Sequence, residues 1–220
     1  AAATGRSAIA GASAAGTSPT SAHLGVRPVR GAVLALRGGG GEEPSDGALQ
    51  ATFACNELFR QVLSNAMSEV AALRKIVAGS EVVPTFGAKA DEIIADAVAK
   101  FEAEMPKGDM EVSGIYQNRA EELRATLVTS LEPVFVQQIC LLKDAALEQF
   151  KKGLVGDGDG SEALAAAEAT FVREASAAVP GKTGWSFKLE RASLVGSMSA
   201  IVTEHKKAQQ AKLQTAGQMQ

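Results

Sequence analysis

Pro180–Thr183 is the stretch of this sequence that comes nearest to a phosphate-binding motif. It reads Pro-Gly-Lys-Thr, which matches the end of the P-loop pattern Gly-x-x-x-x-Gly-Lys-Ser/Thr. The P-loop also needs its first glycine and a preceding strand, because backbone N–H groups must surround the phosphates. Here Ser176 stands at the position of that glycine, and the residues before the motif form an alanine-rich helical pattern. We therefore interpret Pro180–Thr183 as an ordinary turn.

A second stretch resembles the ligand spacing of a calcium-binding EF-hand loop. Asp157, Asp159 and Ser161 alternate with other residues, and Glu168 follows eleven residues after Asp157. An EF-hand loop needs glycine at its sixth position for its sharp turn. That position is Glu162 here, and the alanines that follow favour a helix. The acidic, glycine-rich stretch is therefore interpreted as a connector between helices.

Cysteine and histidine are too few to build most metal or nucleophilic sites, since the chain has two of each. Cys55 and Cys140 are expected on separate helices beside apolar stripes, where a free cysteine usually packs; a disulfide or redox role is the alternative. His205 continues an apolar helix face, and His23 lies far from any expected partner. No Ser/His/Asp, Cys/His or paired-carboxylate arrangement stands out. We therefore predict no catalytic, cofactor-binding or metal-binding residue.

Charge is distributed unevenly along the 220 residues. The whole chain has a net charge of −3 and a pI of about 5.5, which argues against a general nucleic-acid binder. Residues 1–41 contain four arginines and no acid, among many Ala, Gly, Ser and Thr residues. This composition is typical of an organelle-targeting peptide, and an ordinary Ala/Gly tail is the alternative. We predict a leader over residues 1–44 and a helical bundle over residues 45–220.

Beyond the leader, hydrophobic residues recur every three or four positions, as on the packed face of a helix. This spacing predicts helices over residues 49–77, 88–105, 116–150, 161–179 and 186–212. Gly79 is expected to end the first helix in the left-handed conformation, and Gly87 to break the chain before the second. Ser161 is expected to cap the fourth helix, and the glutamine-rich end, residues 209–220, to fray. No apolar run approaches the length of a membrane span.

The third predicted helix is the most informative, because its apolar stripe keeps its phase across Pro133. The step from Leu131 to Phe135 is four residues, as elsewhere in the stripe. Two helices joined by a turn normally lose this phase, so we predict one helix of about 40 residues that is kinked near Pro133. The fold class predicted is an all-α, elongated bundle with bundle or coiled-coil packing. It has three long helices and two shorter ones. The stripe comprises Tyr116, Ala120, Leu123, Leu127, Leu131, Phe135, Ile139, Leu142, Ala146 and Phe150.

Three segments resemble the helical region of dynamin-like GTPases of the root-hair-defective-3/atlastin group. They are Val83–Ile94 (Val-Pro-Thr-Phe-Gly-Ala-Lys-Ala-Asp-Glu-Ile-Ile), Gly184–Phe187 (Gly-Trp-Ser-Phe) and the tail Gln209–Gln220. More narrowly, the chain resembles small stand-alone algal proteins that are related to that helical region. The resemblance implies a stalk or dimerising helical module without the GTPase domain that powers fusion of endoplasmic-reticulum membranes. The stretch Leu-Ala-Leu-Arg-Gly-Gly-Gly-Gly, ending at Gly41, is similar to preprotein leaders of algae with complex plastids.

These features favour a non-enzymatic interaction or scaffold protein that acts through apolar helix faces. Its expected partner is a protein, with a homodimer as one form, and no cofactor or nucleic acid is expected. One alternative is an enzyme or cofactor binder with a site between helices, built from acids and Cys140. Another is a peripheral membrane protein that uses the basic last helix, with Lys206, Lys207 and Lys212. The plastid is the predicted location, and the endoplasmic reticulum is the alternative.

Overall fold

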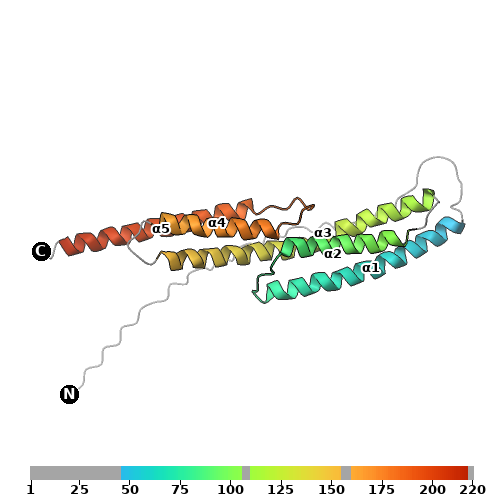
Figure 1. The fold of residues 1–220 in the computed structure, drawn as a ribbon, viewed down its shortest axis with the longest axis horizontal. Helices are drawn as coiled ribbons and strands as arrows, with labels where there is room; N and C mark the ends of the chain where they lie inside the picture. The colour runs from blue at the N-terminus through green and yellow to red at the C-terminus, as the bar shows by residue number, and fades with distance from the viewer. Residues whose placement is uncertain (1–45, 106–109, 155–159, 218–220) are drawn as a thin grey trace, which may run out of the picture. The chain divides into compact units, whose positions relative to one another are not determined.

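The computed structural model describes residues 46–105, 110–154 and 160–217, and these fold into α-helices with no strand among them (Figure 1). The predicted all-α fold is therefore confirmed. The leader predicted over residues 1–44 lies outside the described residues, and so do Asp157, Asp159 and His23. The helices are α1 (Asp46–Ala78), α2 (Phe86–Ala103), α3 (Met110–Gly153), α4 (Ser161–Ala178) and α5 (Lys188–Gly217).

Helix α3 is the element on which the other helices pack. Its first half packs with α1 and α2, which we call the first bundle, and its second half packs with α4 and α5, which we call the second bundle (Figure 1). Helices α2 and α4 also contact each other, whereas α1 contacts neither α4 nor α5 within the described residues. The two bundles are therefore joined through α3 and through the α2–α4 contact.

The apolar stripe of α3 is buried along its whole length, as the sequence predicts. All ten residues of the stripe, from Tyr116 to Phe150, belong to the hydrophobic core. The helix runs through Pro133 without interruption for 44 residues, or about 66 Å at 1.5 Å per residue. One continuous helix is thus confirmed, and a bend at Pro133 stays a prediction. Proline has no N–H, so it offers the carbonyl of Thr129 no helical hydrogen bond.

The first helix ends in a Schellman motif, but its left-handed residue differs from the predicted one. Ser80, with φ 62°, has the left-handed conformation that the sequence assigned to Gly79. The N–H of Glu81 donates to the carbonyl of Ile76 at 3.2 Å, and the N–H of Ser80 donates to the carbonyl of Val77 at 3.0 Å. This pair of bonds defines the motif. The prediction for Gly79 was therefore wrong by one residue, because the two hydrogen bonds place the left-handed conformation at Ser80.

Other predicted helix ends also need correction. Gly87 lies inside α2, which begins at Phe86, so it does not break the chain as predicted. Ser161 is the first residue of α4, and the N-cap is Gly160, with φ 76° and no side chain to cap the helix. The last helix continues to Gly217, so the glutamine-rich stretch up to that residue is helical rather than frayed. The spacing of the hydrophobic residues identified these helices, but not the hydrogen bonds at their ends.

By length and composition alone, one helix within the described ranges could cross a membrane, namely α3 over Val112–Gly153. The central helix of a bundle meets the same criterion, and the stripe of α3 contacts the other four helices. The sequence has no uninterrupted apolar run of that length. Averaged over 18 residues, however, part of α3 is apolar enough to meet the criterion.

Candidate functional site at the middle of helix α3

The two cysteines and His205, which are reactive side chains considered from the sequence, lie on three different helices. Cys55 on α1 is buried and Cys140 on α3 is half-buried, and both are free thiols. His205 on α5 has a ring nitrogen 2.9 Å from the amide nitrogen of Gln209. Among the described residues, no group of three or more His, Cys, Asp or Glu side chains could hold a metal ion. These candidates are therefore dispersed over three helices.

Cys55 lies in an aromatic part of the first bundle that keeps its thiol protonated. Burial raises the pKa of Cys55, with a smaller opposing effect from Arg119. Burial also raises the pKa of the neighbouring Tyr116. The ring of Tyr116 lies 5.7 Å from that of Phe101, which packs edge-on to Phe59 at 6.4 Å. A thiol must ionise before it acts as a nucleophile, so this environment favours packing over reactivity.

Of the carboxylates in the calcium-like pattern, Glu168 on α4 is within the described residues, and its partner is an arginine. Both Nε and Nη2 of Arg191 on α5 donate to Oε1 of Glu168 on α4, at 2.9 Å and 2.7 Å. Glu168 thus joins α4 to α5. The pair is partly exposed, so its contribution to stability is about 1 kcal/mol or less.

The Pro180–Thr183 turn has none of the surroundings of a P-loop. It follows α4, whereas a P-loop follows a strand, and α5 begins only at Lys188. Instead, the turn is held against α2, because the N–H of Gly181 donates to Oδ2 of Asp91 at 2.8 Å. The interpretation as an ordinary turn agrees with this geometry, but the sequence did not indicate its contact with α2.

Gln138 marks the middle of α3, where the connectors of the two bundles meet. Its side chain is 1% exposed and is the one buried polar side chain in the described core. Its Oε1 accepts from the N–H of Val83 at 3.0 Å, and its Nε2 donates to the carbonyl of Val83 at 3.0 Å. The amide therefore pairs with both backbone groups of one residue, as a neighbouring strand would. This fixes the α1–α2 connector to α3.

Three aromatic rings continue this contact across α3 to the α4–α5 connector. The rings of Phe86 and Phe135 lie 6.3 Å apart, and that of Trp185 stacks on Phe135 at 5.0 Å. We call the set Val83, Phe86, Phe135, Gln138 and Trp185 the junction. Aromatic pairs at these distances add about 0.5–1.5 kcal/mol each beyond the area that they bury. The junction thus joins the first bundle to the second.

Gly87 explains how α2 and α4 can approach each other beside the junction. A Cβ atom at Gly87 would lie 2.7 Å from the carbonyl oxygen of Val179 and 2.8 Å from that of Ala177. Both distances are shorter than real Cβ contacts. Glycine is therefore required here by the close approach of the backbone at the end of α4.

Two segments that resemble the atlastin group, Val83–Ile94 and Gly184–Phe187, meet at the junction. Val83, Phe86 and Gly87 come from the first, and Trp185 comes from the second. The periodicity of α3 did not single out Gln138, because a glutamine beside a stripe looks like a solvent-facing residue. Its one sequence signal is its position four residues after Val134, which is also buried.

Comparison with known proteins gives one similarity. No family model matches the chain, and no solved structure matches it. The chain is 24% identical over 179 residues to Protein SEY1 of the fungus Laccaria bicolor. That match covers 77% of this chain and 22% of SEY1, so the chain spans about a fifth of the length of this relative. The similarity is consistent with the resemblance to atlastin-type GTPases at the level of a distant relation.

Proposed function

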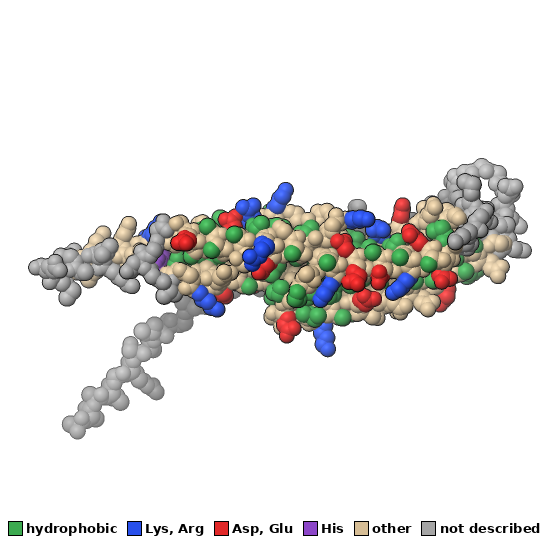
Figure 2. Space-filling view, in the orientation of Figure 1, with side chains coloured by type: hydrophobic (Ala, Val, Ile, Leu, Met, Phe, Trp, Pro, Cys, Tyr) green, Lys and Arg blue, Asp and Glu red, His purple; other side chains and the backbone are tan. Residues whose placement is uncertain are grey.

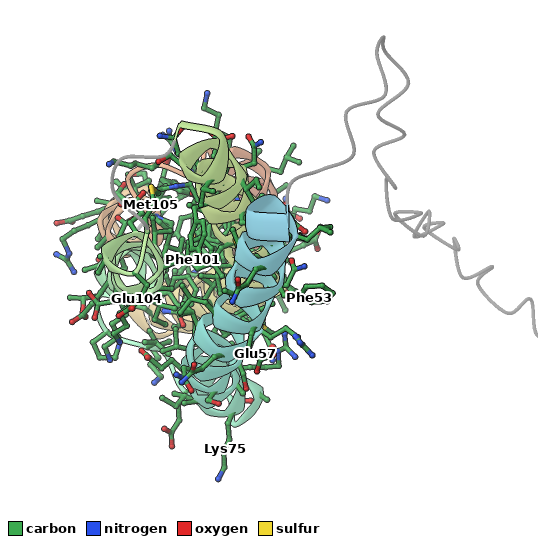
Figure 3. All side chains as sticks on the ribbon, turned by 90° about the vertical axis from the view of Figure 1, so that its right-hand side faces the viewer. Phe53, Glu57, Lys75, Phe101, Glu104 and Met105 are labelled. Atoms are coloured by element: carbon green, nitrogen blue, oxygen red, sulfur yellow. The ribbon has the colours of Figure 1, made fainter. Side chains whose placement is uncertain are left out.

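We propose that this chain is a non-enzymatic interaction module that binds a protein partner through exposed apolar side chains. Leu49 and Phe53 on α1 carry the proposal, because they lie one helical turn apart and are 46% and 76% exposed. Figure 3 shows Phe53 on the outer side of α1, away from Phe101 in the interior. Burying a phenylalanine side chain is worth about 1.5–3 kcal/mol, so a partner that covers Phe53 gains binding energy.

Elsewhere the surface mixes charged and hydrophobic side chains, whereas Leu49 and Phe53 are two exposed apolar side chains one helical turn apart. Figure 2 shows acidic and basic side chains interspersed with hydrophobic atoms over the face seen there. Further exposed apolar residues are Ile76, Val82, Val136 and Leu189. Of these, only Leu189 is more exposed than Phe53, at 82%. Leu189 lies on α5 in the second bundle, so it offers a control site away from α1.

The test is site-specific photo-crosslinking of the full chain in extracts of its native organism. A photoreactive amino acid at position 53 is expected to capture a defined protein, identified by mass spectrometry. The variant Leu49→Ser/Phe53→Ser, checked for helix content by circular dichroism, is then expected to lose binding to that purified protein. Leu189→Ser is the matched control and should keep it. Equal binding by the wild type and the double variant contradicts the proposal.

A second candidate is a membrane-associated module related to atlastin-type GTPases, and the similarity to SEY1 supports it. Lys206 and Lys207 are exposed on α5 and would supply the contact with an anionic membrane surface. Flotation with anionic liposomes at low and high salt tests this function. Binding at low salt that is lost in Lys206→Ala/Lys207→Ala supports it, and no flotation at low salt overturns it.

The plastid destination, with the endoplasmic reticulum as the alternative, remains part of this proposal. It rests on the arginine-containing, acid-free composition of residues 1–41. Sequencing the N-terminus of the protein isolated from its native organism tests it: a start near residue 45 supports a cleaved leader.

A further inference from the structure

A groove of about 370 Å³ lies between α2, α3 and the Pro180–Thr183 turn, beside the junction. Its apolar wall consists of Ile94 and Ala95 on α2 and Val128 on α3. Volumes of about 300–1,000 Å³ with a mostly apolar lining and a few polar groups are typical of small-molecule sites. The groove therefore has the size and lining of a ligand site, and the polar groups at its rim decide which ligand it suits.

The turn that closes one side of the groove is held in place by its own hydrogen bonds. Asp91 accepts the N–H of Gly181 at 2.8 Å. The hydroxyl of Thr183 donates to the carbonyl of Pro180 at 3.3 Å and accepts the N–H of Trp185 at 3.5 Å. The carboxylate of Asp91 and the hydroxyl of Thr183 are thus used to position the turn. Lys182, which lies between Gly181 and Thr183, lines the groove from this hydrogen-bonded turn.

Two positive charges at the groove have no acidic partner. Arg124 on α3 and Lys182 in the turn both line it, and neither forms an ion pair with a described carboxylate. Other described basic side chains, such as Arg74 and Lys75, also lack an ion pair, so what sets Arg124 and Lys182 apart is the apolar wall beside them. Counting Asp91, the groove has two cations and one carboxylate, and that carboxylate already accepts a hydrogen bond.

We propose that this groove binds a single-chain anionic amphiphile, such as a long-chain carboxylate or a phosphate monoester. Its head would interact with Arg124 and Lys182, since charged hydrogen bonds from these donors to carboxylate or phosphate are the strong ones. Its hydrocarbon chain would cover Ile94, Ala95 and Val128. The combination of unpaired cations with an apolar wall distinguishes this ligand from a free phosphate, which would leave the wall uncovered. This inference goes beyond the partner binding proposed above and uses different residues.

The test is titration of the full chain with dodecanoate and with dodecyl phosphate, both below their micelle concentrations. Trp185 is the one tryptophan of the sequence and follows Thr183 by two residues, so its fluorescence reports on the turn. We expect saturable binding at one site, confirmed by calorimetry. In Arg124→Ala/Lys182→Ala the affinity is expected to fall about tenfold or more, as losing charged hydrogen bonds implies. The two ligands show whether carboxylate or phosphate is the preferred head.

Matched controls distinguish binding at this groove from non-specific electrostatic and hydrophobic binding elsewhere on the protein. Arg74→Ala/Lys75→Ala removes the same two residue types from exposed positions on α1 and should bind like the wild type. Ala95→Phe should fill the groove and abolish binding while both cations remain. Dodecyl maltoside, which is uncharged, and inorganic phosphate, which has no chain, should both bind much more weakly. Equal affinity of the wild type and Arg124→Ala/Lys182→Ala for dodecanoate overturns the proposal, and so does inorganic phosphate binding as tightly as dodecyl phosphate.

Discussion

The side-chain amide of Gln138 forms hydrogen bonds with both backbone groups of Val83, which lies in the connector between α1 and α2. Because both groups of Val83 are buried with this amide, removing the amide leaves two backbone groups without partners. Gln138→Leu is therefore expected to lower the free energy of unfolding by about 2–4 kcal/mol, measured by urea denaturation.

The neighbouring glutamine is a suitable control for this substitution. Gln137 is exposed, and its amide makes a single 3.3 Å bond to the carbonyl of Val77. Water can replace that bond, so Gln137→Leu is expected to change the stability by less than about 0.5 kcal/mol. If the two substitutions have the same effect, the paired hydrogen bonds of Gln138 do not stabilise the junction.

Ser80 has a conformation that suits glycine better than serine. With φ 62° it lies in the left-handed region, where a Cβ atom is unfavourable. Ser80→Gly is expected to raise the free energy of unfolding by about 0.5–1 kcal/mol, since glycine relieves this strain. Ser80→Ala keeps the Cβ atom and should lie within about 0.5 kcal/mol of the wild type. Loss of stability in Ser80→Gly would show that the serine hydroxyl matters more than the backbone.

Among the helices, α2 and α4 are the pair whose contact depends on one glycine. Gly87→Ala places a methyl group 2.7 Å from a backbone oxygen of Val179, which cannot move without shifting the end of α4. We expect a loss of about 1–3 kcal/mol in the free energy of unfolding, as for other overpacked positions. Gly114→Ala in α3 is the control, because a Cβ atom there meets nothing within 4 Å. It should instead stabilise the helix by about 0.5–1 kcal/mol. Thermal unfolding followed by circular dichroism measures both, and similar shifts for the two variants would contradict the close approach at Gly87.

The helices themselves could be predicted from sequence much better than their ends. The stripe of α3 needs only the repeat of apolar residues, and every stripe residue from Tyr116 to Phe150 is buried. The ends depend on hydrogen bonds and contacts that a local pattern does not contain. Gly87 looks like a helix breaker until α4 is placed beside it, and Gly79 looks like a left-handed residue until the bonds of Ser80 and Glu81 are known.

At the scale of the whole molecule, the junction is the feature that the sequence did not predict. Sequence spacing shows which residues share a helix face, but it does not show which connectors lie against each other. Val83 and Gln138 are 55 residues apart, and Asp91 and Gly181 are 90 residues apart. Val83, Phe86 and Trp185 lie in segments with a recognisable resemblance, but only the tertiary structure shows that they meet at Phe135 and Gln138.

Alkaline conditions are expected to destabilise the folded chain. Burial raises the pKa of Cys55 above its ordinary value of 9.0 and that of Tyr116 above its ordinary value of 10.0. Above these ordinary values the unfolded chain loses protons that the folded chain keeps, so stability is full at lower pH and falls as the pH rises through the folded pKa. Urea denaturation at about pH 8 and about pH 10.5 measures the loss, which should be smaller in Tyr116→Phe. An equal loss in both proteins would mean that Tyr116 ionises as easily in the folded state.

Because α3 runs unbroken through both bundles, its length between them is fixed by geometry. One inserted residue near Glu132 would turn every later side chain by about 100° around the axis, so Phe135, Ile139 and Phe150 would rotate out of the core. Seven inserted residues would restore the direction to within about 20°, but they would lengthen the helix by about 10.5 Å and separate α2 from α4. Length changes among relatives are therefore expected to avoid the centre of this helix.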